Sequence, residues 1–193
     1  MEMMLRCAMP DRPGALAELA GAIGEAGGDI QSVDVVDRTT AKDGTPVVVD
    51  DLVVAADGDR GASLLARVRA VPGVELQHAG PSRGVPGDAV TRLAVMLEAL
   101  LTGQAEPDRA ILTLLGGPLR AGSARLVPRG DAPPAQSRRL VLDLGNRVAV
   151  LERDYRFTET ERERAEALVR LCMLTSPDAG CAGGTPERTA AGD

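Results

Sequence analysis

The chain has 193 residues, of which 44% are apolar and only 1% are aromatic, and its net charge is −6 at pH 7. This length allows one large domain or two small ones, with cores built from aliphatic side chains. The negative charge and the scarcity of aromatic rings disfavour nucleic-acid binding, which needs basic and stacking side chains.

Residues suited to metal or nucleophilic chemistry are sparse. The cysteines Cys7, Cys172 and Cys181 form no C-x-x-C pair, and His78 is the single histidine. We therefore expect no metal site, no cofactor and no Cys-His or Ser-His catalytic pair. The sequence has no run of about 18 apolar residues and no basic segment followed by an apolar run at its start. These features predict a soluble, cytoplasmic protein that does not bind membranes.

The start of the chain predicts a strand followed by a helix. Residues 3–9 alternate between apolar and other side chains, and Pro10 ends the pattern. Residues 16–26 have helical spacing, Pro13 suits a helix start, and a glycine pair at 27–28 ends the helix. We expect the core stripe of this helix to be Leu16, Leu19 and Ile23.

A hairpin, a helix and a strand follow. Residues 30–36 and 47–55 are β-branched runs that flank a polar turn with Asp43-Gly44, which is typical of an antiparallel hairpin. Residues 64–71 have an amphipathic helical pattern, and residues 74–78 alternate as a last strand. The resulting βαββαβ order predicts a ferredoxin-like α+β module, an antiparallel sheet with helices on one face.

A loop motif connects the first predicted strand and helix. It reads Asp11-Arg12-Pro13-Gly14-Ala15-Leu16, and Gly27-Gly28-Asp29-Ile30 opens the second strand. Gly14 allows a tight turn, and the N–H groups of Gly14, Ala15 and Leu16 at a helix start favour an anion such as a carboxylate. Asp11 and Asp29 are candidates to receive an ammonium group. The motif therefore predicts a site for an amino-acid zwitterion.

The D-x-P-G-x-L motif, the following glycines and the element order resemble the ACT family over about residues 3–79. The resemblance implies a small amino-acid ligand held at the interface of a homodimer. Asp29 stands where an Asn is frequent in that family, and Met9 stands where some amino-acid-binding members carry a histidine. The ligand-binding residues that the resemblance implies are Asp11, Arg12, Pro13, Gly14, Ala15, Leu16, Asp29 and Ile30.

The same loop also fits a purely structural role. In that alternative Asp11 caps the helix, Pro13 starts it, Gly14 relieves steric crowding, and no ligand binds. The chain would then be a ligand-free ACT module for dimerisation or protein interaction. His78 is expected to be a surface or edge residue.

Glycine and proline punctuation divides the chain. The segment 80–87 contains two prolines and three glycines, and we interpret it as a linker. It separates an ACT ligand-binding domain, 1–79, from a small α+β domain, 88–174. The composition of residues 175–193 predicts a disordered tail.

The second domain is expected to have a helix at each end. A helix over 90–101 precedes an apolar run, 110–115, that predicts a buried strand, and strands at 140–144 and 148–151 flank a Gly145-Asn146 turn. A capping box, Thr158 to Glu161, opens the last helix. The Phe157-Thr158-Glu159-Thr160-Glu161 ending resembles the close of GAF sensor domains, which implies a small GAF-like α+β domain.

Function follows mainly from the first domain. We predict a regulatory sensor that binds an amino acid and passes an allosteric change to the second domain. The second domain is also a candidate surface for a protein partner. An enzyme is not expected. A buried acidic pair in the second domain, for example Asp143 and Asp154, would be the exception. Five arginines of the second domain suit contact with an anion or with another protein, and the simpler interpretation is that they lie in a solvated loop. They are Arg120, Arg125, Arg129, Arg138 and Arg139.

Overall fold

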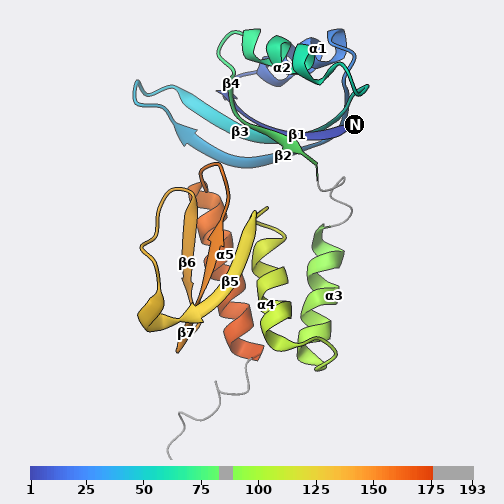
Figure 1. The fold of residues 1–193 in the computed structure, drawn as a ribbon. Coiled ribbons are helices and arrows are strands. Elements are labelled where there is room, and N and C mark those ends of the chain that lie inside the picture. The colour runs from blue at the N-terminus through green and yellow to red at the C-terminus, as the bar shows by residue number, and fades with distance from the viewer. Residues whose placement is uncertain (83–88, 176–193) are drawn as a thin grey trace, which may run out of the picture.

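The computed structural model describes residues 1–82 and 89–175, and its elements form two units, each with its own sheet (Figure 1). The predicted tail 175–193 lies almost entirely outside the described residues, as does most of the predicted linker 80–87. The last strand of the first unit runs to Pro81, so Gly80 and Pro81 belong to that strand and not to a linker. The strand continues because both residues pair with the first strand of the chain.

The first unit has the predicted βαββαβ order. Its four-stranded antiparallel sheet has the strand order β2-β3-β1-β4, as in a ferredoxin-like fold. Both helices cover one face of this sheet, the upper face in Figure 1. The elements are β1 (Glu2–Pro10), α1 (Ala15–Glu25), β2 (Asp29–Thr40), β3 (Pro46–Ala55), α2 (Gly61–Ala70) and β4 (Glu75–Pro81).

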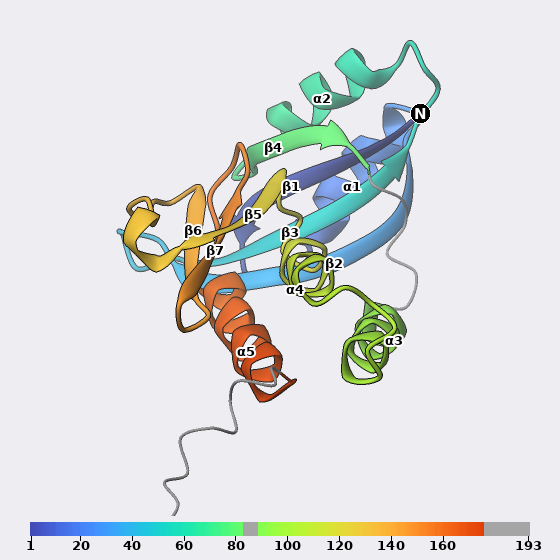
Figure 2. The same cartoon turned by 60° about the horizontal axis from the view of Figure 1, so that its bottom comes forward.

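The two faces of this sheet are both buried. On the helix-covered face, alternate residues of β1 and β3 form an aliphatic core with α1 and α2. The opposite face carries Met4, Arg6, Ala8, Asp51 and Val53, which are also buried. Figure 2 shows why, because the second unit lies against this face, with α4 viewed nearly end-on and α5 obliquely.

The start of α1 differs from the structural alternative for the loop. Gly14 occupies the N-cap position with a φ of 91°, in the left-handed region that favours glycine, and no side chain caps the helix. Asp11 therefore does not cap α1, and Pro13 precedes the helix instead of starting it. Leu16 was also misplaced, because it is 40% exposed while Ala15 faces the core.

The second unit has a three-stranded antiparallel sheet of order β5-β7-β6 packed against helices. A second, separate apolar core joins its sheet to α4 and α5, with Phe157 and Leu151 among its buried members. The elements are α3 (Ala89–Leu101), α4 (Pro107–Gly116), β5 (Ser123–Pro128), the 3-10 turn η1 (Arg129–Asp131), β6 (Arg139–Asp143), β7 (Arg147–Glu152) and α5 (Glu159–Thr175).

The strand predicted over 110–115 is wrong, because these residues belong to the helix α4. The helix starts with Pro107 directly after Glu106, whose carboxylate accepts hydrogen bonds from the backbone N–H groups of Asp108 and Arg109. Proline in the first turn and a side-chain acceptor before it are signals for a helix start. The apolar residues 110–115 form the buried side of this helix.

The predicted hairpin turn and capping box of the second unit are confirmed. Leu144 and Arg147 close the β6–β7 hairpin around Gly145, which has a φ of 87°. In the capping box, the Glu161 N–H donates to Thr158 Oγ1 and the Thr158 N–H donates to Glu161 Oε2. Asp143 and Asp154 form no acid pair, because Asp143 binds Arg129 and Asp154 approaches His78.

Candidate functional site

The D-x-P-G loop forms an exposed turn at the end of β1. The Asp11 N–H donates to Pro46 O at 2.9 Å, which ties the loop to the start of β3, and Asp11 Oδ2 lies 3.5 Å from Arg38 Nε on β2. Residues 11–14 are exposed to solvent. The loop is therefore held at one end of the sheet and open to a ligand.

The first turn of α1 has N–H groups without acceptors. The Ala15 N–H donates to Arg12 O at 3.2 Å and the Glu18 N–H donates to Gly14 O at 2.9 Å. Within the described residues, no acceptor faces the N–H groups of Gly14, Leu16 and Ala17. The predicted donor set was thus partly wrong: Ala15 is occupied within the loop, and Ala17 takes its place.

Arg12 adds a positive charge to this helix start. Its guanidinium donates to Pro13 O and to Glu18 Oε2, at 3.3 and 2.8 Å, and so folds back over the first turn. A Cβ on Gly14 would stand 3.8 Å from Arg12 Nη1. Unpaired N–H donors, the positive end of the helix dipole and a guanidinium together favour an anion such as a carboxylate.

Asp29 and Ile30 lie far from this loop in the same chain. Asp29 pairs with Ala55 at the end of β3, whereas Asp11 is tied to Pro46 at its beginning. At about 3.3 Å per residue, the length of β3 separates them by about 30 Å. The Asp29 carboxylate instead accepts a hydrogen bond from Gln31 Nε2 at 2.5 Å. One chain alone does not bring the predicted site residues together.

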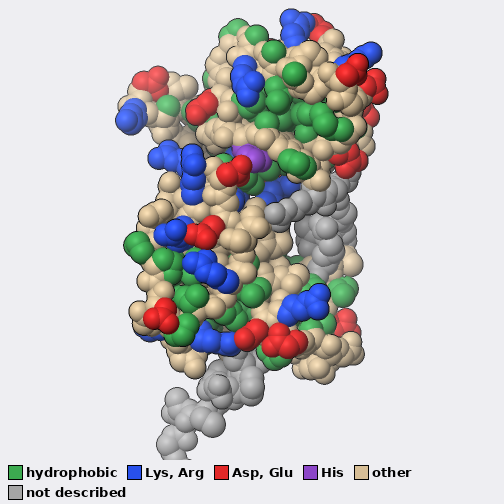
Figure 3. All heavy atoms as spheres, in the orientation of Figure 1, with side chains coloured by type: hydrophobic (Ala, Val, Ile, Leu, Met, Phe, Trp, Pro, Cys, Tyr) green, Lys and Arg blue, Asp and Glu red, His purple; other side chains and the backbone are tan. Residues whose placement is uncertain are grey.

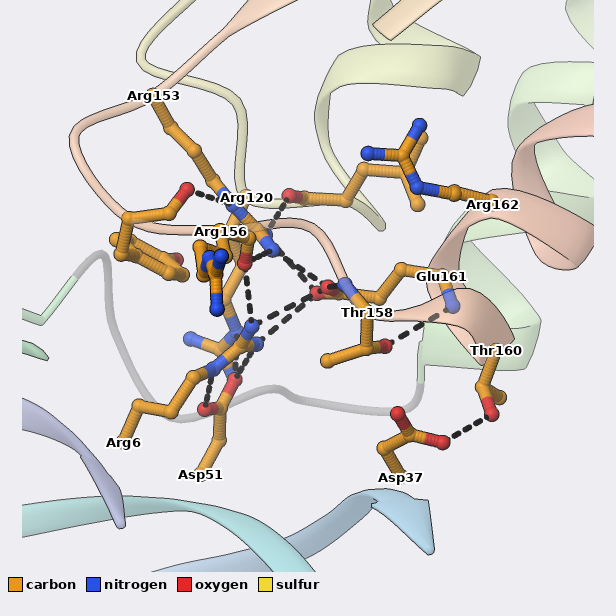
Figure 4. Close-up of polar contacts among 12 residues, drawn as sticks. Arg6, Asp37, Asp51, Arg120, Arg153, Arg156, Thr158, Thr160, Glu161 and Arg162 are labelled. Atoms are coloured by element: carbon orange, nitrogen blue, oxygen red, sulfur yellow. Dashed lines mark hydrogen bonds and ion pairs between the residues drawn. The ribbon is translucent and has the colours of Figure 1, made fainter. Parts of the chain in front are cut away.

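A second polar cluster lies where the two units meet. Arg6 on β1 is 1% exposed and binds Asp51 on β3 through both ends of its guanidinium, with Nε–Oδ1 and Nη2–Oδ2 distances of 2.7 and 2.9 Å. Arg6 Nη2 also donates to Glu161 Oε1 at 2.9 Å (Figure 4). The carboxylate of Glu161, at the start of α5, thus connects the ACT-like sheet to the second unit. We call Arg6, Asp51, Arg120, Arg153 and Glu161 the junction cluster.

Arg153 holds the same carboxylate from the other side. Its Nη1 donates to Glu161 Oε1 at 2.9 Å and to Leu119 O at 2.7 Å. Burial raises the pKa of the Glu161 carboxyl, but hydrogen bonds from Arg153 and Arg6 and their charges lower it to about 2. The carboxylate is therefore ionised at neutral pH and shared by two guanidinium groups.

Arg120 and the aromatic residues complete the junction. Arg120 has a φ of 50°, in the left-handed region, and its Nε lies 3.2 Å from Asp51 Oδ2. Tyr155 stacks on His78 with ring centroids 4.2 Å apart, and the Arg153 guanidinium lies 4.1 Å from the Tyr155 centroid. His78 lies on the edge strand β4, as expected, and its ring is partly buried at the junction.

The junction also contains open space. A cavity of about 1070 Å³ lies between the second unit and the face of the first sheet opposite its helices. Figure 3 shows charged side chains gathered at the level where the units meet. Lining residues include Met4, Val36, Met96, Leu114 and Arg120. The units are thus joined by a few strong polar contacts beside a loosely filled space.

The comparison with protein families decides what the first unit is. Residues 3–73 match the family model described as the ACT domain. These residues are an ACT domain. The match ends before the second unit, so the GAF resemblance stays a prediction. No curated protein matches the chain.

Three solved structures are similar to the chain at low scores. The ACT domain from GTP pyrophosphokinase of Chlorobium tepidum is 21% identical over 42% of this chain and 95% of that chain, with a TM-score of 0.30. The ligand-free regulatory subunit of aspartate kinase from Thermus thermophilus is 15% identical over 90% and 91%, with a TM-score of 0.32. A formyltetrahydrofolate deformylase from Pseudomonas putida KT2440 is 14% identical over 54% and 39%, with a TM-score of 0.31. Scores this low carry no conclusion about function.

The ACT domain provides two of the five junction residues, and the sequence analysis singled out neither. Arg6 was assigned to the polar side of an alternating strand, and Asp51 was hidden in a β-branched run. A usable signal was present, because the residues that alternate with the core positions in β1 and β3 are mostly apolar, which is unusual for a solvent-facing side. Arg120 had been assigned to a solvated loop, and the structure places it in the junction cluster.

The described parts of the chain contain neither a metal-binding cluster nor a membrane-spanning helix. In residues 1–82 and 89–175, no cluster of three or more His, Cys, Asp or Glu side chains is arranged to hold a metal ion. None of the helices in these ranges is long and apolar enough to span a membrane.

Proposed function

We propose that this chain is a regulatory protein whose ACT domain binds a free α-amino acid at the start of α1. The observation that carries the proposal is the set of N–H donors of Gly14, Leu16 and Ala17, which have no acceptor among the described residues. Arg12 places a positive charge beside them. A ligand carboxylate would satisfy these donors and gain the favourable end of the helix dipole.

The site is completed in this proposal by a second copy of the chain. β2 is an edge strand of the sheet, and Val33 and Val35 on it are 38% and 47% exposed. In this dimer the two β2 strands pair antiparallel about a two-fold axis. The Asp29 end of β2 in one copy then lies next to the Thr40 end of β2 in the other copy, beside Asp11 and Arg38 of that copy. The predicted residues on the loop and at Asp29 and Ile30 then form one site across a homodimer.

The junction cluster is the proposed route from the ligand to the second unit. Arg6 and Asp51 lie on the central strands of the ACT sheet, and Glu161 and Arg153 belong to the second unit. A change in the sheet on ligand binding alters the geometry of these shared ion pairs. Such coupling between two places is what a regulator requires. The proposal assigns no catalytic step to the chain.

Dimerisation without a ligand is the second candidate function. The exposed Val33, Val35 and Leu16 favour it, because they lie at the α1–β2 edge and association would remove them from water. Under this alternative the chain forms a dimer that no amino acid stabilises.

Thermal unfolding with each of the twenty common L-amino acids separates the two functions. A ligand at about 100 times its Kd stabilises the fold by about 2.7 kcal/mol. In sedimentation velocity, the same ligand is expected to leave the dimer unchanged or to strengthen it. The carboxylate-free amine of each hit serves as the control and should not stabilise the protein. A folded dimer that no amino acid stabilises would favour the second candidate.

A further inference from the structure

A buried carboxylate lies on the helix-covered face of the ACT sheet, outside the junction cluster. Asp50 is 2% exposed, and its Oδ1 is buried without a hydrogen-bond partner among the described residues. Its cross-strand partners are Cys7 on β1 and Val35 on β2. Cys7 belongs to the core beneath the helices, so Asp50 faces that side as well.

The spacing along α1 and β3 indicates which part of the helix lies toward Asp50. Ile23 and Val54 both pack around Gly28, because a Cβ there would stand 2.7 Å from Ile23 Cγ2 and 3.0 Å from Val54 Cγ1. Ala15 is about 12 Å back along the helix from Ile23, and Asp50 is about 13 Å back along the strand from Val54. Because α1 and β3 run in the same direction, this spacing puts the start of α1 toward the Asp50 part of the sheet.

The pairing of β2 with β3 is irregular beside Asp50. β2 has an irregularity between Val35 and Asp37, directly opposite Asp50, so that Val36 is left out of the pairing. Bulges of this kind occur beside functional sites because they interrupt the ladder and redirect side chains. Val35, the partner of Asp50 on the edge strand β2, is exposed. Asp50 thus lies one strand in from the exposed β2 edge, beside the interruption in the pairing.

Charges around Asp50 match the proposed ligand site. Burial raises the pKa of Asp50, Arg38 lowers it, and the nearby Asp51 and Asp11 raise it further. Asp11 and Arg38 are the same residues that border the loop. A buried carboxyl group among other acids is stabilised by a cation, and no lysine or arginine donates to it within the described residues.

We propose that Asp50 receives the ammonium group of the ligand while the N–H donors of α1 hold its carboxylate. This inference rests on the proposed function and deepens it, because it makes the site selective for α-amino acids over other carboxylic acids. It gives Asp50 the role that the sequence analysis assigned to Asp11 and Asp29. The site then recognises both charged groups of one ligand from a single chain, and a partner copy adds further contacts.

The test compares each amino acid that binds with the α-hydroxy acid of the same side chain, using calorimetric titration. The wild-type protein should bind the amino acid at least about tenfold more tightly, since a hydrogen bond to a charged group is lost in the hydroxy acid. Asp50→Asn should reduce this preference to below about threefold while leaving the affinity for the hydroxy acid nearly unchanged. Asp131→Asn, an exposed change in the second unit away from the proposed site, is the matched control and should keep the wild-type preference.

The outcomes separate this inference from the function on which it rests. If the wild-type protein binds neither amino acids nor hydroxy acids, the proposed function fails and the role of Asp50 fails with it. If both classes bind but Asp50→Asn keeps the preference, or Asp131→Asn loses it as well, the role of Asp50 alone is overturned. Circular dichroism verifies that each variant is folded. Asp50→Ser, smaller and also neutral, carries the same expectation should Asp50→Asn not fold.

Discussion

Arg6 and Glu161 are 155 positions apart in sequence, yet Arg6 Nη2 donates to Glu161 Oε1 at 2.9 Å in a buried contact. Glu161 also closes the capping box of α5 by accepting from the Thr158 N–H. One carboxylate therefore starts a helix of the second unit and binds the sheet of the ACT domain. A movement of the α5 start therefore displaces a binding partner of the ACT sheet, and a movement of the sheet displaces a binding partner of α5.

Replacing Glu161 tests the strength of this connection. Glu161→Gln keeps the size of the side chain but leaves Arg6 and Arg153 without a shared anion, and we expect a loss of about 3–5 kcal/mol in the free energy of unfolding. Urea unfolding monitored by circular dichroism measures this loss. Glu163→Gln, an exposed change on the same helix, should cost less than about 0.5 kcal/mol. Equal small losses in both variants would contradict a structural role for the cluster.

Acid should weaken the folded state through the same carboxylate. The pKa of Glu161 is lowered from 4.5 to about 2, so the unfolded chain binds more protons than the folded one in that range. The stability due to Glu161 is then fully present above its ordinary pKa and is lost as the pH falls toward 2. Unfolding free energies measured from pH 6 down to about pH 3 should fall more steeply for the wild type than for Glu161→Gln. Parallel curves would show that this carboxylate does not titrate as described.

Asp50 should have the opposite pH dependence. Its pKa is raised in the folded state, so its contribution favours folding below its ordinary pKa and is lost as the pH rises through the raised value. Asp50→Asn removes the buried charge, and we expect the ligand-free variant to be more stable than the wild type at pH 7, by on the order of 1 kcal/mol. Differential scanning calorimetry at pH 4 and pH 7 measures the difference, which should shrink at the lower pH. A variant less stable at pH 7 would show that the carboxylate has a partner there.

Alanine variants of two glycines with nearly the same backbone angle distinguish an effect of backbone strain from an effect on ligand binding. Gly14 has a φ of 91° in the ligand loop, and Gly44 has a φ of 88° in the β2–β3 turn. Alanine at either position should cost about 1–2 kcal/mol because a Cβ disfavours this conformation. Only Gly14→Ala should also remove the stabilisation by an amino acid, since it shifts the donors of the loop. Loss of the ligand effect in both variants would indicate a general effect of lower stability.

Local patterns predicted the ACT domain well, because its helices and strands have clear periodicity and its turns use glycine. They failed at α4, where a short apolar run looks the same in a buried strand and in a buried helix side. The deciding signal was the Glu106-Pro107-Asp108 start, which precedes that run.

The candidate site was predictable only in part. The loop and the helix start follow from a motif, but the choice of donors depends on how Arg12 O turns back to the Ala15 N–H. The junction cluster joins residues from both ends of the chain, and strand alternation alone assigns Arg6 to solvent. Asp50 and Asp51 are adjacent in sequence, but neighbouring residues of a strand point to opposite faces of the sheet. Asp51 therefore meets the second unit, and Asp50 lies on the helix-covered face.

The contacts of Tyr155 with His78 and Arg153 give this protein an intrinsic optical probe. The chain has one tyrosine and no tryptophan, so its tyrosine emission comes from a single ring at the junction. Movement of the second unit away from the ACT sheet would change the surroundings of that ring. Ligand-driven motion is therefore measurable in the unlabelled wild-type protein, with no residue introduced and no dye attached.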